Sequence, residues 1–311
     1  MTARRHLFHI GLPKAGSSFL QTGIFPALAS EGIIAVKHEY RQQLRDVMCH
    51  LSTEQKIFAT GDDDRKIPLI TSEEWVLGLK PQEWSLRIKR FISICPPNSE
   101  IILVIRDPVE WTRSAASQLL NEGWVKNIEA ACSSEDGIKA SDINYETIIE
   151  AIRAAGVPLH IVHLTALTDR DVWESILDVI IPEEMWKRAI QSGRRYRSLS
   201  ALGVRLYQAR DRLLERFGLM VLGSEQAFQH FGAASQQAIN SITPLEDLTN
   251  AERFRLLPGR VIRELLYRVG SSSLLHKISG SPILESSTCA PLSPTEKSLQ
   301  QQKYLFIPGT T

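Results

Sequence analysis

Short apolar runs alternate along the chain with segments in which apolar residues recur every three to four positions. Five runs have the length and composition of strands, at residues 7–10, 33–36, 67–72, 100–105 and 159–164. Helical spacing marks the segments between and after them, at 17–31, 42–51, 81–95, 145–152 and 171–181. Continuous apolar strands are typical of parallel sheets covered on both faces. The alternation predicts an α/β fold with a central, mostly parallel sheet flanked by helices.

The pattern changes in the last third of the chain. A helix is predicted up to residue 217 and another over 250–269, whereas Ser, Pro and Gly are frequent from 270 onward. Such composition is typical of segments that bury little apolar surface. We therefore predict one α/β domain over residues 1–270, with a helical C-terminal part, and a loosely structured tail over 271–311.

Composition excludes several classes of function. Lys and Arg number 36 against 35 Asp and Glu, a formal charge of +1, so we expect no nucleic-acid partner and no polybasic membrane surface. The four cysteines lie far apart without metal-ligand spacing, at positions 49, 95, 132 and 289. No apolar run reaches about 18 residues, so no membrane span is predicted. We expect a cytoplasmic protein with reduced thiols and no bound metal.

The first strand leads into a loop that is suited to binding an anion. After Ile10 the chain breaks at Gly11, and a helix is predicted to begin at Ser17 or Ser18. The first N–H groups of a helix have no carbonyl partner within it, and the helix dipole adds positive potential there. Lys14 adds a full charge within the loop. The stretch therefore predicts a phosphate-binding loop.

The spacing of this loop differs from that of the nucleoside-triphosphate P-loop, G-x-x-x-x-G-K-[ST]. Gly11 and Gly16 are spaced correctly, but Ser17 stands where the lysine should be, and the lysine lies at position 14. A P-loop lysine reaches the β- and γ-phosphates, and the hydroxyl after it holds magnesium. Lys14 would instead lean over the loop toward the group attached to the first phosphate. The spacing argues against a magnesium-dependent NTPase.

A second motif follows the strand at 100–105. Asp107 suits a helix N-cap, Pro108 the first helical position, and Glu110 the capping-box position. Arg106 precedes this helix start and Ser114 lies about two turns into the helix. Both motifs follow strands of one predicted parallel sheet, and ligands of open α/β sheets bind at the carboxyl ends of the strands.

Together the two motifs resemble those of sulfotransferases that use 3′-phosphoadenosine 5′-phosphosulfate (PAPS). The family pattern P-K-x-G-[ST]-[ST] is matched by Pro13, Lys14, Ala15, Gly16, Ser17 and Ser18. The pattern R-[ND]-P, with serine eight residues after the arginine, is matched by Arg106, Asp107, Pro108 and Ser114. A further family arginine is replaced here by Trp111, to which we give no role. The resemblance implies a P-loop-like three-layer fold and PAPS as the donor, without a metal.

The resemblance also implies residue roles. Lys14 would neutralise charge on the leaving phosphate oxygen, helped by residues 13–18, while Arg106 and Ser114 would hold the 3′-phosphate. Arg195, or Tyr196 beside it, lies where family members often carry a basic loop over the phosphates, although no fixed motif marks the place.

The base is expected at the end of the strand at 67–72, where some branches of the family have a glutamate. Glu73 is our first choice and Glu74 the second, with His9 and His38 as weaker candidates. The acceptor implied by the resemblance is a saccharide or glycolipid hydroxyl, or else a small alcohol. Two alternatives stay open: a P-loop kinase or NTPase, and a non-catalytic nucleotide-binding protein on the same fold.

Overall fold

The computed structural model describes a sheet-containing unit in most detail. The described residues are 4–50, 67–78, 81–96, 98–122, 132, 138–193, 201–216, 272, 277–278 and 303–309. The chain divides into two compact units. The first comprises residues 1–111, 140–196 and 290–311, and the second comprises residues 112–139 and 197–289.

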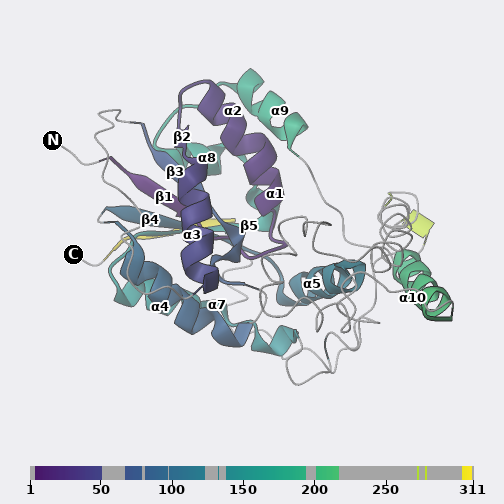
Figure 1. Cartoon of the computed structure of the whole chain (residues 1–311). Helices are drawn as coiled ribbons and strands as arrows, with labels where there is room; N and C mark the ends of the chain where they lie inside the picture. The colour runs from purple at the N-terminus through teal and green to yellow at the C-terminus, as the bar shows by residue number, and fades with distance from the viewer. Residues whose placement is uncertain are drawn as a thin grey trace. The chain divides into compact units, whose positions relative to one another are not determined.

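A six-stranded sheet forms the centre of the first unit (Figure 1). Its strands are β1 (His6–His9), β2 (Ala35–Val36), β3 (Leu69–Ser72), β4 (Ser99–Ile105), β5 (Leu159–His163) and β6 (Tyr304–Ile307). They lie in the order β2-β3-β1-β4-β5-β6; β6 is antiparallel to β5 and every other pair is parallel. The prediction of a mostly parallel central sheet is confirmed.

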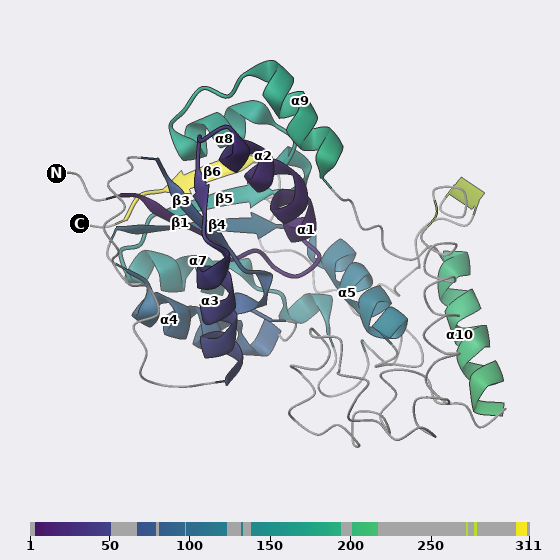
Figure 2. The same ribbon diagram turned by 45° about the horizontal axis from the view of Figure 1, so that its top comes forward.

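Helices cover both faces of this sheet (Figure 2). One face carries a continuous helical segment made of α1 (Ser17–Phe19), a π-helical turn (Leu20–Ile24) and α2 (Phe25–Ser30), together with α8 (Arg170–Leu177) and α9 (Glu183–Ser192). The other face carries α3 (His38–His50), α4 (Trp84–Ile94) and α7 (Tyr145–Ala154). This arrangement is a three-layer α/β architecture.

The remaining helical elements are short turns and two longer helices. The 3₁₀ turns are Glu74–Val76, Pro81–Glu83, Ala140–Asp142 and Leu164–Ala166. Helix α5 (Pro108–Glu122) begins in the first unit, and α10 (Ala201–Arg216) belongs to the second. The N-cap predicted for α5 is confirmed, because Asp107 Oδ1 accepts a hydrogen bond from the Glu110 N–H at 2.9 Å.

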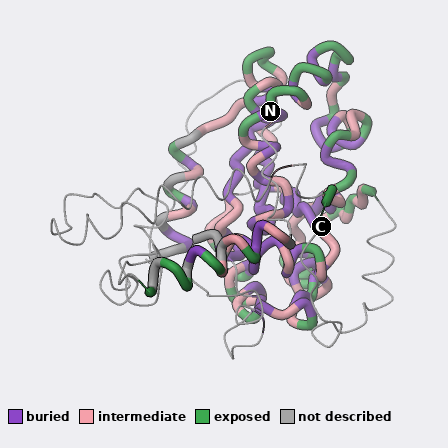
Figure 3. The backbone as a smooth tube through the Cα atoms, turned by 90° about the vertical axis from the view of Figure 1, so that its right-hand side faces the viewer, coloured by how far each residue is buried: buried purple, intermediate pink, exposed green. Residues whose placement is uncertain are grey.

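The core of the first unit lies between the strands and the two helical layers (Figure 3). All residues of β1 and β3 are buried, as are Ile101–Ile105 of β4. Phe8 of β1 packs edge-to-face on Phe91 of α4 and joins the sheet to one helical layer, and Phe25 of α2 packs in the same way on Trp173 of α8 within the other layer, at ring-centroid distances of 5.4 and 5.6 Å. Such pairs add about 1 kcal/mol each to the burial of their area.

One helix and one strand of the sheet-containing unit have no counterpart in the sequence prediction. Helix α9 was not predicted, and β6 lies within the segment 271–311 that was expected to be a loosely structured tail. The structure differs from that prediction at residues 304–307, where β6 pairs with β5 in antiparallel register. Most of the rest of the predicted tail lies outside the described residues. Of the described cysteines, Cys95 and Cys132 are free thiols.

A polar network connects β6 with β4 and β5. His160 contacts Glu100 Oε2 through Nε2 at 2.7 Å and the Tyr304 hydroxyl through Nδ1 at 2.8 Å. Arg5 donates to both oxygens of Glu100, at 2.6 and 2.7 Å. Burial by itself raises the pKa of Glu100, but the hydrogen bonds from Arg5 and His160 outweigh it and lower the pKa to about 2. Glu100 is therefore held as a carboxylate.

This network predicts a loss of stability in acid. Because the pKa of Glu100 is lowered on folding from 4.5 to about 2, its contribution is complete above pH 4.5 and disappears as the pH falls toward 2. Urea midpoints measured between pH 6 and 2 should fall more steeply for the wild type than for Glu100→Gln. Parallel curves for the two proteins would contradict this reading of the network.

Candidate functional site

The loop after β1 has a backbone conformation that suits anion binding. Lys14 and Gly16 both have a positive φ angle, of 68° and 90°. These angles lie in the left-handed region of backbone conformation, which residues other than glycine rarely adopt. Alternation of right- and left-handed residues turns successive N–H groups toward one point, which is an anion-binding geometry. The Ala15 N–H bonds to Leu12 O within the turn at 3.0 Å. The amides without an intrahelical carbonyl are therefore those of Gly16, Ser17 and Ser18.

The helix that follows the loop contains a π-helical turn. Leu20–Ile24 adopts this wider winding between α1 and α2, and the segment packs against α9. A Cβ built on Gly23 would lie 2.5 Å from Gly193 Cα, so the backbones of the two helices approach each other closely at that point. Single π-helical turns are frequent at functional sites.

The two sequence motifs follow adjacent strands at a topological switch point. Strands β1 and β4 pair directly, with His9 opposite Ile102. From β1 the chain continues toward β2 at one side of the sheet, and from β4 it continues to β5 at the other. Ligands of open α/β sheets bind in the crevice outside the carboxyl ends of two such strands.

The second motif is hydrogen-bonded to the loop. Arg106 Nη1 donates to the Lys14 carbonyl at 3.1 Å, and the indole Nε1 of Trp111 donates to the Pro13 carbonyl at 2.6 Å. Trp111, to which the sequence reading gave no role, is fully buried and packs edge-to-face on Trp84 at 5.6 Å. Both bonds accept on carbonyls at the Pro13–Lys14 turn, so the start of α5 fixes the conformation of the loop.

Three polar side-chain atoms around the loop are buried without a hydrogen-bond partner among the described residues. They are His9 Nε2, Arg106 Nε and Ser17 Oγ, of which the last lies near the Glu74 carboxyl but without the geometry of a hydrogen bond. More than about 90% of buried polar groups in proteins are paired, so each of these requires an explanation. An oxyanion has several acceptor lone pairs on each oxygen and fits a group of donors of this kind. The residues present therefore fit a phosphate or sulfonate group at the loop.

Comparisons with known proteins identify no family for the chain. A scan against models of protein families finds no match, and a search of curated proteins finds none either.

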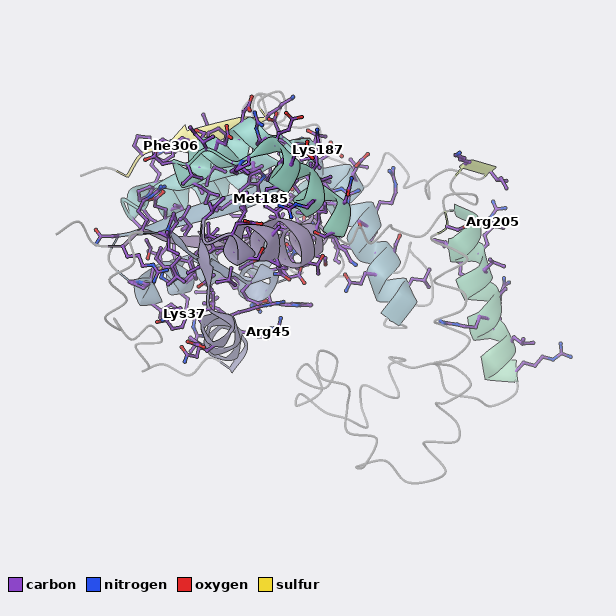
Figure 4. All side chains as sticks on the ribbon, turned by 90° about the horizontal axis from the view of Figure 1, so that it is seen from above. Lys37, Arg45, Met185, Lys187, Arg205 and Phe306 are labelled. Carbon is purple, nitrogen blue, oxygen red and sulfur yellow. The ribbon has the colours of Figure 1, made fainter. Side chains whose placement is uncertain are left out.

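Glu73, the first choice for the base, is fully buried and its oxygens are engaged. Its carboxylate accepts from the Trp75 N–H at 3.0 Å and from Arg41 Nε at 3.2 Å. Arg45 approaches it through Nε at 3.2 Å and Nη2 at 3.1 Å. Both arginines come from α3, on which Arg45 is labelled in Figure 4. Glu73 thus anchors α3 to the end of β3.

Glu74, the second choice for the base, is half-buried and lies near Lys14 of the loop. Burial raises the pKa of its carboxyl, and the adjacent charge of Glu73 raises it further. Lys14, Arg41 and the Ser17 hydroxyl are near enough to oppose that rise. A carboxyl with a raised pKa beside a loop lysine is suited to exchanging a proton at the site.

The other predicted site residues are placed as follows. Ser18 is half-buried, and Ser114 is buried on α5 within the second unit. Arg195 and Tyr196 lie outside the described residues, as does the side chain of His38. No role in the site is read from the structure for these three.

Two kinds of feature are absent from the part of the chain that the structure describes. No group of three or more His, Cys, Asp or Glu side chains there has the geometry to hold a metal ion. None of the described helices has the length and apolarity needed to cross a membrane.

The packing around Gly16 gives a prediction for the loop. A Cβ on Gly16 would lie 2.2 Å from Leu167 Cδ1, and φ is positive, so we expect Gly16→Ala to cost about 2–3 kcal/mol. Gly32→Ala is the matched control, since Gly32 also has positive φ but nothing lies within 4 Å of its built Cβ. That control should cost only about 1 kcal/mol. Equal losses in urea unfolding would show that contact with Leu167 is unimportant.

Proposed function

We propose that the chain binds PAPS and transfers its sulfuryl group to an acceptor hydroxyl. The observation that carries the proposal is the direct bonding of the two motifs, Arg106 to the Lys14 carbonyl and Trp111 to the Pro13 carbonyl. These bonds join a phosphate-binding loop, which lacks the lysine–serine pair that serves magnesium-bound phosphates in a P-loop, to an arginine at the end of the neighbouring strand. The 5′- and 3′-phosphates of PAPS would each contact one of these two motifs. We also propose that the three-layer fold is of the P-loop-like type.

The loop would bind the 5′-phosphosulfate end of the donor. The amides of Gly16, Ser17 and Ser18 and the positive end of the helical segment supply donors and positive potential. Lys14 supplies the charge that stabilises the negative charge developing on the phosphate oxygen when the sulfur–oxygen bond breaks. Because these donors are held in place before the reaction, little reorganisation is needed when that charge develops.

The 3′-phosphate would be held by Arg106. Its Nη1 donates to the Lys14 carbonyl and its Nη2 to the exposed Glu110 Oε2, and the first of these bonds orients the guanidinium. Its Nε is buried and has no partner among the described residues. Ser114 as a second contact to this phosphate stays a prediction from sequence, as does Arg195.

We assign proton transfer to Glu74 rather than to Glu73. The Glu73 oxygens accept from two arginines and a backbone amide, so this group has a structural task. The pKa of Glu74 is raised, and Lys14 and Ser17 lie near it. In the proposed reaction the acceptor oxygen forms a bond to sulfur, the bond from sulfur to the phosphate oxygen breaks, and Glu74 takes the hydroxyl proton. The acceptor we propose is a saccharide or glycolipid hydroxyl, with a small alcohol as the next class.

The experiment that tests this function is transfer of ³⁵S from labelled PAPS. The purified chain should move label to at least one member of a panel of saccharides, glycolipids and small alcohols, in the presence of EDTA. Release of phosphate from ATP with magnesium, with no transfer of label, would favour the kinase or NTPase alternative. Binding of nucleotide without turnover on any acceptor would favour the non-catalytic alternative.

A further inference from the structure

His9 is the last residue of β1 and lies directly under the loop. It is fully buried, and its ring makes an edge contact with Phe25 at 5.9 Å between centroids. Nδ1 contacts Ser72 Oγ at 2.7 Å, on the neighbouring strand β3. Burial, with the charge of Arg41 adding to it, lowers the pKa of His9 to about 3, so the imidazole is neutral at physiological pH.

The hydrogen bonds around Ser72 determine which ring nitrogen carries the proton. Gln21 Nε2 donates to Ser72 Oγ at 3.0 Å and to the Ser72 carbonyl at 3.3 Å. The Ser72 hydroxyl therefore accepts from Gln21 and donates its own hydrogen to His9 Nδ1. The opposite tautomer would leave the Ser72 hydrogen without an acceptor. The arrangement that satisfies all these groups places the proton of His9 on Nε2.

This Nε2–H is directed into the loop. A Cβ built on Gly11 would lie 2.5 Å from His9 Nε2 and 2.9 Å from Ser17 Oγ, so both atoms lie over the same glycine. Both are buried, and neither has a partner among the described residues. Ser17 is the first residue of α1, so the imidazole N–H lies at the helix start, where amides and dipole already favour negative charge.

We infer that His9 is a neutral hydrogen-bond donor of the anion site, oriented by Gln21 and Ser72 and directed at an oxygen of the bound phosphate or sulfonate group. The inference rests on the anion site of the proposed function but not on sulfuryl transfer. Lys14 contributes charge to the site, whereas a neutral donor in a fixed position contributes direction. Since the ring would contact the ligand and not the acceptor, His9 is a binding residue and not the base.

The chain offers a matched control on the same strand. His6 is also buried in β1, its pKa is also lowered to about 3, and it also contacts a β3 hydroxyl, Thr71 Oγ1, at 2.9 Å. It lies at the opposite end of the strand from the loop. The side-chain amide nitrogen of asparagine lies where histidine has Nδ1, and that of glutamine lies where histidine has Nε2. Making both substitutions at each site therefore distinguishes the role of one ring nitrogen from that of the other.

Calorimetric titration of the folded variants with adenosine 3′,5′-bisphosphate, and with ATP and magnesium, tests the inference. We expect His9→Asn to weaken binding about tenfold, which is the effect of losing one donor to a charged ligand. His9→Gln should retain most of the wild-type affinity. Both His6 variants should retain all of it. Equal affinity of His9→Asn and wild type, or an equal loss in His6→Asn, would overturn it. A tenfold loss with ATP but no bisphosphate preference would support His9 and overturn the proposed function. A wild type that binds neither nucleotide would overturn both.

An independent readout is the ring ¹⁵N spectrum of the wild type. The Nε2–H tautomer of His9 should be present between pH 5 and 8, and its Nε2 proton resonance should shift when adenosine 3′,5′-bisphosphate is added. A resonance pattern of the Nδ1–H tautomer would overturn the inference whatever the nucleotide results.

Discussion

Replacement of Lys14 by alanine is expected to lower kcat/KM for sulfate transfer about 10³-fold, the usual effect of removing one fixed donor from a developing oxyanion. The loop itself should persist, because Trp111 and Arg106 hold its turn through the Pro13 and Lys14 carbonyls, which the substitution leaves in place. The measurement is initial-rate transfer of ³⁵S together with the thermal unfolding midpoint.

A surface lysine provides the control for that result. Lys187 on α9, labelled in Figure 4, is half-exposed and pairs with Glu183 and Glu184. Lys187→Ala should leave transfer unchanged. If Lys14→Ala retained a third or more of the wild-type rate, the assignment of Lys14 to the leaving phosphate would be wrong.

Replacement of Glu74 by glutamine is expected to have the second large effect, a loss of about 10³-fold in kcat with little change in stability. Since the carboxylate is the form that accepts a proton, the wild-type rate should rise with pH through the raised pKa of Glu74, and this limb should disappear in Glu74→Gln. The measurement is the pH profile of transfer for both proteins.

Substitution of the neighbouring Glu73 distinguishes a loss of catalysis from a loss of stability. Glu73→Gln leaves Arg41 and Arg45 without their buried counter-charge, and we expect a loss of about 2 kcal/mol in unfolding free energy. That is less than for a fully buried pair, because the two guanidiniums are 34% and 23% exposed. A large loss of rate in Glu73→Gln with full activity in Glu74→Gln would reverse our assignment of the two residues.

The parts of the fold that the sequence predicted are those with strong local signals. Continuous apolar runs predicted β3 and β4, and the Asp107–Pro108 pair predicted the start of α5, since an N-cap and a first-turn proline are readable from adjacent residues. Strand β6 was missed although its residues, Tyr304–Ile307, form a short apolar run. Its four residues lie in a Ser- and Pro-rich region, and what stabilises them is pairing with β5 and the contact of Tyr304 with His160, 144 positions away.

The site was predicted only in part for the same reason. The loop and Arg106 could be found because each is a short motif at a strand end. The choice between Glu73 and Glu74 depends on Arg41 and Arg45, about thirty residues earlier, and the sequence does not show that α3 packs beside β3. Their i, i+4 spacing on a helix was the one available signal that both would face the same partner.

His9 and Trp111 illustrate how burial changes the reading of a residue type. His9 was a weak candidate for the base, but full burial lowers its pKa to about 3, and its bond to Ser72 directs the Nε2–H into the loop. Trp111 stands where some of the sulfotransferases that the two motifs resemble have an arginine, and its indole N–H instead holds the loop through the Pro13 carbonyl. Neither result follows from residue type or spacing.

The central claim is that this site takes a nucleotide with 5′- and 3′-phosphates and needs no metal. Calorimetric titration in EDTA with adenosine 3′,5′-bisphosphate, compared with ATP in the presence of magnesium, tests it most directly. We expect the bisphosphate to bind at least about tenfold tighter, a difference of ~1.4 kcal/mol, with the preference lost in Arg106→Ala. Tighter binding of magnesium ATP, or an unchanged preference in Arg106→Ala, would contradict the account.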